Sequence, residues 1–195
     1  MKIGMIGGIG PESTVDYYRR IINLYRKKTG GDDYPEIIVN SINMTRMLKM
    51  VSDKNWDALT GVLTDAAQSL FKAGAGFAFI ASNTPHLVFD QVQKASPLPL
   101  VSIVEAARKE AEKLGIKKAG LLGTLFTMQS SYYKAEFEKS GMAIVLPNEE
   151  EQQYIQNKLF LEIENGVFLK KTRRGLLKII KRLIRDASIE GVILG

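Results

Sequence analysis

Short apolar segments recur along the chain, and each has the length and residue types of a β-strand. They lie at residues 2–8, 36–42, 76–82, 98–103, 118–124, 143–147 and 190–195. Between most of them, apolar residues repeat at helical spacing, which predicts helices over 13–28, 56–73, 104–114, 130–139, 151–164 and 172–187. Strands that alternate with helices of this length predict βαβ units and a mostly parallel sheet. The strand segments are continuously apolar, so helices are expected on both faces of the sheet.

The pattern also divides the chain into two similar halves. Each half opens with a short strand and a helix, and each contains an apolar strand that ends in small polar residues, "AGAGFAFIASNT" and "KKAGLLGTLFT". The proline-containing segment "SPLPL" at 96–100 is a natural crossover. We therefore predict two similar three-layer α/β/α domains over residues 1–97 and 98–195, with a ligand cleft where the carboxyl ends of their strands meet.

Composition limits the class of protein. The chain of 195 residues is 45% hydrophobic and 25% charged, which is typical of a globular protein. No apolar segment is long enough to span a bilayer, and the N-terminus does not resemble a signal peptide, so we expect a cytoplasmic protein without a membrane partner. The sequence contains no Cys and one His, so we expect neither disulfides nor a metal site.

The positive charge is concentrated in one predicted helix. The formal net charge is +6, and residues 170–185 combine eight Lys and Arg with apolar residues at helical spacing. The simplest interpretation is a solvated basic face, because no aromatic residues are interleaved as in single-strand binders. We therefore expect no nucleic-acid partner. The alternative is an anion- or nucleotide-binding module whose basic helix contacts nucleic acid, and it predicts strongly salt-dependent binding.

The first strand ends in the glycine-rich segment "GGIGPEST". Gly8 and Gly10 would let the backbone approach a ligand, and Ser13 or Thr14 is expected to cap the following helix. Exposed amides at that helix start favour a carboxylate or a phosphate. The segment matches neither the dinucleotide fingerprint nor the P-loop. A tight turn without a ligand is the alternative.

The third strand ends in "IASNTPH", which places three hydrogen-bonding side chains in succession: Ser82, Asn83 and Thr84. Capping of the next helix would explain one of them but not all three. His86 is expected to be a packing residue, although a general base of this type is chemically possible.

Further candidates follow other strands. Thr124 follows the fifth strand and repeats the small polar theme. Arg46 follows the second strand and could bind a second carboxylate, with a surface arginine as the alternative. Lys158, in the helix expected at 151–164, could reach the same ligand. Together these residues are suited to a small polar molecule that carries carboxylates.

Four segments together resemble one enzyme family. "IGGIGPEST", "ASNTPH", "LLGTLFTM" and "EGVILG" occur in the order and spacing of the aspartate/glutamate racemase family, over nearly the whole chain. The resemblance implies two α/β domains related by a pseudo-twofold, with the active site between them. It also implies an isomerase that racemises an acidic amino acid without pyridoxal phosphate or another cofactor, commonly as a homodimer.

In that family, one cysteine abstracts the α-proton and a second, on the opposite face, returns one. The first cysteine precedes the Asn-Thr pair, where this chain has Ser82; the second follows the glycine that corresponds to Gly195. We expect the sequence to be a fragment whose continuation begins with that cysteine. The resemblance places Ser82 at the first proton-transfer position and Asn83 and Thr84 on the substrate. The alternative is an impaired relative that binds an acidic amino acid without racemising it.

Overall fold

The computed structural model describes residues 1–195 and divides into two compact units, Met1–Ile103 and Val104–Gly195. Each unit contains its own parallel sheet. The boundary lies at residue 103, whereas the sequence predicted it at residue 97. The reason is β4 (Leu100–Val101), which pairs with β3 and so belongs to the first unit.

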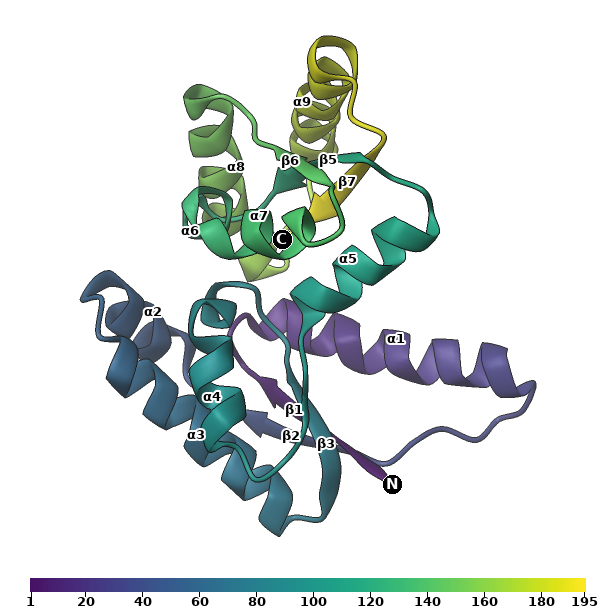
Figure 1. Ribbon diagram of the computed structural model, residues 1–195, viewed down its shortest axis with the longest axis vertical. Coiled ribbons are helices and arrows are strands. Elements are labelled where there is room, and N and C mark those ends of the chain that lie inside the picture. The colour runs from purple at the N-terminus through teal and green to yellow at the C-terminus, as the bar shows by residue number, and fades with distance from the viewer. The chain divides into compact units, whose positions relative to one another are not determined.

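The first unit is a four-stranded parallel sheet between two layers of helices (Figure 1). Its strands are ordered β2-β1-β3-β4, with β1 at Lys2–Gly7, β2 at Ile37–Ser41 and β3 at Ala75–Ile80. The helix α1 (Pro11–Thr29) covers one face. The helices α2 (Met44–Ser52), α3 (Trp56–Lys72) and α4 (Phe89–Ala95) cover the other.

Alternation along the central strands explains the two layers. Ile6 and Ile80 face α3 and are fully buried there with Leu59 and Leu63. Their neighbours in the chain face α1, where the ring of Phe79 lies 5.2 Å from the ring of Tyr17. Because successive side chains of a strand point to opposite faces, an apolar run without alternation fills both layers.

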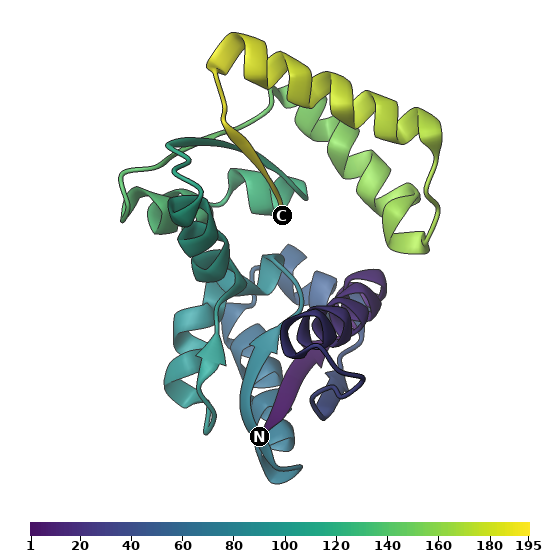
Figure 2. The same ribbon diagram turned by 90° about the vertical axis from the view of Figure 1, so that its right-hand side faces the viewer.

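The second unit has a three-stranded parallel sheet, in which β5 (Lys118–Leu122) lies between β6 (Ala143–Val145) and β7 (Gly191–Leu194). Its helices are α5 (Ile103–Lys113), α6 (Leu125–Gln129), α7 (Ser131–Glu138), α8 (Glu149–Leu161) and α9 (Lys170–Ala187). The helices α8 and α9 lie side by side (Figure 2), and an ion pair between Glu151 and Arg182 joins them. Leu183 and Ile179 of α9 are buried. No helix of the protein combines the length and the apolar character that crossing a bilayer requires.

The predicted fold class is confirmed, and every predicted strand and helix is present with bounds that differ by a few residues. The prediction missed α2, α4, α6 and the 3-10 helix at Ile163–Asn165, and the helix that it expected after "IASNTPH" is the 3-10 helix Thr84–Val88. These elements are short, so their apolar periodicity is weak. A signal for α2 was present, because Asn43 caps it by accepting a hydrogen bond from the Arg46 amide at 2.9 Å.

Candidate functional site

The first unit has a topological switch point between β1 and β3. From β1 the chain continues to β2 on one side, and from β3 it continues to β4 on the other. The loops that leave two such strands diverge, which opens a crevice at their carboxyl ends where ligands of parallel sheets bind. Backbone bonds from Ala81 to Ile6 and from Ile42 to Gly7, both 2.9 Å, keep these ends in register. The structure therefore brings the segments 7–10 and 81–84 to one edge.

The glycine loop after β1 is held rigidly by Thr14. The Gly8 amide donates to Thr14 Oγ1 at 2.9 Å, and the Thr14 hydroxyl donates to the Gly10 carbonyl at 3.0 Å. Two expectations are thereby corrected. Neither Ser13 nor Thr14 caps α1, whose N-cap is Gly10, and the Gly8 amide is already bonded within the loop. Gly8 and Gly10 shape the crevice through their backbone conformation.

Ser82 and Asn83 lie half-buried at the end of β3, next to the buried Thr84. The expected helix after them is a 3-10 helix, and Asn83 occupies its N-cap position without making a side-chain capping bond. Capping therefore does not account for Asn83. A half-buried amide and a half-buried hydroxyl at a switch point are suitable for a small ligand with hydrogen-bonding groups.

His86 connects the end of β3 to the last residue of the first unit. Its side chain is 5% exposed and stacks on Phe89 with the ring centroids 5.1 Å apart. Nδ1 donates to the Ser82 carbonyl at 2.9 Å, and Nε2 accepts the Ile103 amide at 3.3 Å. Burial lowers the pKa of His86 to about 4, so the imidazole is neutral at neutral pH. Both ring nitrogens are occupied, so His86 is the expected packing residue and is not placed as a base for the Ser82 hydroxyl.

The buried imidazole predicts a pH-dependent stability. The pKa of His86 is about 4 in the folded protein and about 6.5 when unfolded, so the unfolded state binds the proton more tightly. Above about pH 6.5 the imidazole is neutral in both states, and protonation does not reduce the free energy of unfolding. As the pH falls from about 6.5 toward about 4, the unfolded state takes up the proton first and the free energy of unfolding decreases. We expect this residue to account for a loss of roughly 2 kcal/mol between about pH 7 and pH 5.

Urea unfolding of the wild type and of His86→Gln at both pH values would measure this contribution. Glutamine keeps a donor and an acceptor but does not titrate in this range. The variant is expected to be less stable at neutral pH and to lose less stability on acidification. Equal losses in the two proteins would show that His86 is not the titrating group.

The structure does not bring Arg46 to the edge between β1 and β3. Arg46 is exposed on α2 and borders a cavity of about 320 Å³ at the end of β2, which is the outermost strand. The cavity is also lined by the acidic residue Asp65 of α3, whose charge would repel a ligand carboxylate. Arg46 thus stays a prediction, placed one strand away from the residues it was expected to join.

In the second unit, the carboxyl ends of the paired strands β5 and β7 lie side by side. The strand ends approach so closely that a Cβ on Gly123 would lie 2.7 Å from the Gly195 carbonyl oxygen. Thr124 caps α6, because its Oγ1 accepts the Thr127 amide at 3.1 Å. Its hydroxyl also lies 3.1 Å from the Thr127 hydroxyl, which accepts from Tyr132 at 3.3 Å. Burial raises the pKa of Tyr132, so this chain of hydroxyls is neutral.

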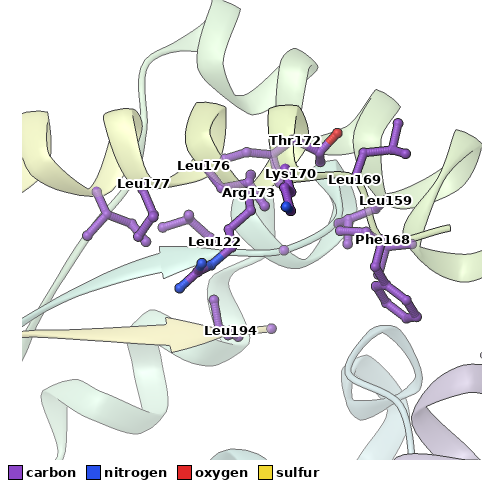
Figure 3. Close-up of a pocket in the computed structure, with 15 residues that line it drawn as sticks. Leu122, Leu159, Phe168, Leu169, Lys170, Thr172, Arg173, Leu176, Leu177 and Leu194 are labelled. Atoms are coloured by element: carbon purple, nitrogen blue, oxygen red, sulfur yellow. The ribbon is translucent and has the colours of Figure 1, made fainter. Parts of the chain in front are cut away.

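A cavity of about 520 Å³ opens beside these strand ends, between α8 and α9 (Figure 3). Its lining is apolar, with Leu122, Leu159, Leu176 and Leu194 among the contributors. Its only charged lining residues are Lys170 and Arg173, and Figure 3 shows Arg173 reaching from α9 toward the strand ends. The sequence interpretation missed this pair, because it treated residues 170–185 as one solvated face. The available signal was that Lys170, Arg173, Leu176 and Ile180 follow one another three or four residues apart, which places them on one side of a helix.

Lys158 does not line that cavity. Its ammonium pairs with Glu162 and lies 5.7 Å from the centroid of the Tyr154 ring. The other Glu162 oxygen accepts the hydroxyl of Thr172, so the carboxylate ties α8 to the first turn of α9. The hydrogen bond with Glu162 raises the pKa of Lys158. The structure thus gives Lys158 a role in joining two helices, and its role on a ligand stays a prediction.

Comparison with known proteins agrees with this architecture. Residues 6–195 match the family described as Asp/Glu/hydantoin racemase. The broad specificity amino-acid racemase RacX of Bacillus subtilis (strain 168) is 28% identical over 190 residues, which cover 96% of this chain and 82% of RacX.

Solved structures show the same fold. An aspartate racemase homologue from Pyrococcus horikoshii OT3 is 39% identical, with a TM-score of 0.87 over 100% of this chain and 84% of its own. An aspartate racemase from Picrophilus torridus is 16% identical and shares the fold, with a TM-score of 0.75 over 98% of this chain and 78% of its own. The chain belongs to the Asp/Glu/hydantoin racemase family, and the relatives it matches are amino-acid racemases.

Proposed function

We propose that this protein is a cofactor-independent racemase of an acidic amino acid, aspartate or glutamate. The observation that carries the proposal is the edge between β1 and β3, where a rigid glycine loop lies beside Ser82, Asn83 and Thr84. Small, neutral hydrogen-bonding groups at a switch point are suited to the α-carboxylate and ammonium groups of an amino acid. We further propose that it works in the cytoplasm as a homodimer.

In this proposal, Ser82 occupies the position from which the α-proton is exchanged on one face of the substrate. Asn83 and Thr84 hold the α-carboxylate or the ammonium group, so that the α-carbon is presented to Ser82. Racemisation requires a base on one face and an acid on the other, and the carbanion between them needs hydrogen-bond donors. In the proposal, Gly8 and Gly10 let the substrate approach the backbone closely, because glycine has no side chain.

Each unit contains cations that suit an acidic side chain. Arg46 borders the polar cavity at the end of β2, and Lys170 and Arg173 are the charged groups of the second unit's cavity. Lys170 and Arg173 are exposed beside this apolar lining, where their charges can attract a carboxylate. The name of RacX includes broad specificity, so substrates other than aspartate and glutamate belong in the same assay.

A second candidate function is binding without turnover. It is favoured by the environment of Ser82, because His86 is bonded to the Ser82 carbonyl and leaves the hydroxyl without an imidazole base. Exchange of the α-proton of L-aspartate or L-glutamate with deuterium from D₂O separates the two. Exchange together with formation of the D-isomer supports the racemase. Saturable binding without either supports the binding protein.

The substrate site predicts a strong effect of Asn83. We expect Asn83→Ala to weaken binding of aspartate or glutamate by roughly tenfold or more, because a hydrogen bond to a charged ligand group is lost. Titration calorimetry would measure the dissociation constants. The matched control is Asn157→Ala, since Asn157 is exposed on α8 and bonds only to Gln153. Unchanged affinity in Asn83→Ala would remove Asn83 from the site.

A further inference from the structure

The positive charge of the protein is located in a single helix. The helix α9 contains eight of the 27 Lys and Arg residues and one of the 21 acidic residues. It therefore carries a formal charge of +7, while the rest of the chain sums to −1. No acidic residue lies in its first turn, although the helix dipole favours acidic groups there. The cations in the first turn of α9 therefore interact unfavourably with the dipole of the helix.

Apolar side chains are exposed on the same side of α9. Leu177 and Ile184, two helical turns apart, are 41% and 52% exposed. Phe168 and Leu169, which directly precede the helix, are 72% and 48% exposed. We define the outer face of α9 as Arg174, Leu177, Lys178, Lys181, Ile184 and Arg185. At helical spacing these six residues lie opposite the buried Ile179 and Leu183.

Most cations of this face lack acidic partners. Arg174, Lys178 and Lys181 make no ion pair, and Arg185 pairs only with Asp186, its neighbour in the chain. A groove of about 880 Å³ runs beside Arg174, Leu177, Lys178, Lys181 and Arg185, and Glu150 and Glu151 of α8 line its other side. A solvated helix face is usually polar throughout. Exposed leucine and isoleucine side chains among the cations therefore indicate a surface that binds a partner.

We propose that the outer face of α9 docks on the surface of an anionic lipid bilayer. A helix of this kind lies in the plane of the interface, with cations on phosphate headgroups and apolar side chains at the acyl boundary. A helix that lies on the membrane surface does not have to span the bilayer. The docking therefore replaces the earlier expectation that the protein has no membrane partner, and it requires no transmembrane segment. Leu177 lines both the outer face and the cavity that we propose for the substrate, but Lys178, Lys181 and Ile184 do not line that cavity. Substituting the two lysines therefore tests the docking separately from the proposed racemase activity.

Two other occupants fit the face less well. A second copy docked by a twofold axis would bring one +7 helix against another, which is repulsive. A nucleic acid would neutralise the cations but would leave Leu177, Ile184 and Phe168 unused, and α9 has no aromatic residue for base stacking.

The test is co-sedimentation of the full chain with vesicles of phosphatidylcholine, either alone or with about 30% phosphatidylglycerol, in about 0.1 M salt. We expect binding only to the anionic vesicles. Lys178→Glu/Lys181→Glu is expected to weaken it by about tenfold or more. The matched control is Lys27→Glu/Lys28→Glu, which changes the net charge equally at the exposed end of α1. If both double variants weaken vesicle binding equally, the effect comes from the net charge alone and the proposal is wrong.

The apolar part of the face is tested separately. Leu177→Ser/Ile184→Ser is expected to weaken vesicle binding several-fold, whereas Leu24→Ser/Leu114→Ser, at exposed positions elsewhere, is not. No loss in the first variant, or tighter binding to duplex DNA than to vesicles, would assign the face to nucleic acid. Complete loss of vesicle binding in millimolar inorganic phosphate would show that the face binds free anions and would overturn the proposal. Dimers in solution that Lys178→Glu/Lys181→Glu dissociates would show that the face is a dimer interface and would also overturn it. Circular dichroism would confirm that each variant folds.

Discussion

Replacing Gly8 with alanine is expected to cost roughly 3–5 kcal/mol of stability, the combined effect of a strained backbone and an overpacked site. Gly8 has a φ of +80°, which side chains rarely adopt. A Cβ there would also lie 2.3 Å from the Ile42 carbonyl oxygen and 2.5 Å from Ser41 Oγ. Backbone cannot move aside as the end of a flexible side chain can, so the ends of β1 and β2 would have to separate.

The matched control is Gly30→Ala. Gly30 ends α1 with a φ of +73°, but a Cβ at this position would have no other atom within 4 Å. This substitution should cost only the backbone strain, roughly 1–2 kcal/mol. Urea unfolding of both variants separates strain from crowding. Equal costs would mean that the loop after β1 rearranges easily and is not a rigid element of the site.

The strands were predictable because each is a continuous apolar segment in a sheet buried on both faces. The same reasoning found the helices whose apolar residues repeat over several turns, such as α3 and α9. It placed the domain boundary too early at the proline segment, because β4 has only two residues and its pairing with β3 is not visible in periodicity. Pairing between strands distant in the chain is a property of the tertiary structure.

The site was predictable only in part. Strand ends of parallel sheets bind ligands, so the position of Ser82, Asn83 and Thr84 followed from the sequence. Which hydrogen bonds these ends make did not follow. The Thr14 hydroxyl returns to the glycine loop instead of capping α1, and His86 reaches the amide of Ile103. Both bonds depend on how non-adjacent segments fold together, which no local spacing encodes.

The choice among cations shows the same limit. Lys158, Lys170 and Arg173 are all basic residues on predicted helices, and their residue types alone do not favour any one of them. Glu162 distinguishes them in the structure, because its carboxylate pairs with Lys158 and accepts a hydrogen bond from Thr172 at the start of α9. That arrangement leaves Lys170 and Arg173 lining the apolar cavity. An acidic residue four positions from a lysine on a helix is a sequence signal for such a pair.

Ser82→Cys is expected to raise exchange of the substrate α-proton with solvent by roughly 10²-fold, which is a typical contribution of general acid–base catalysis. A free cysteine has a pKa of about 8.5, so a useful fraction is thiolate near neutral pH. The serine hydroxyl needs an activating base, and the imidazole of His86 is occupied by the Ser82 carbonyl and the Ile103 amide. Proton NMR in D₂O with L-aspartate and L-glutamate would measure the exchange.

The pH dependence and two controls make the result specific. Exchange by Ser82→Cys should increase with pH up to about 8.5, where the thiol ionises. Ser82→Ala should remain as slow as or slower than the wild type, and Ser52→Cys, at the exposed last residue of α2, should show no gain. A gain limited to Ser82→Cys would place position 82 against the α-carbon. If the α-proton of bound substrate exchanges no faster in Ser82→Cys than in the wild type, Ser82 does not face the α-carbon. The proposed orientation of the substrate would then be wrong.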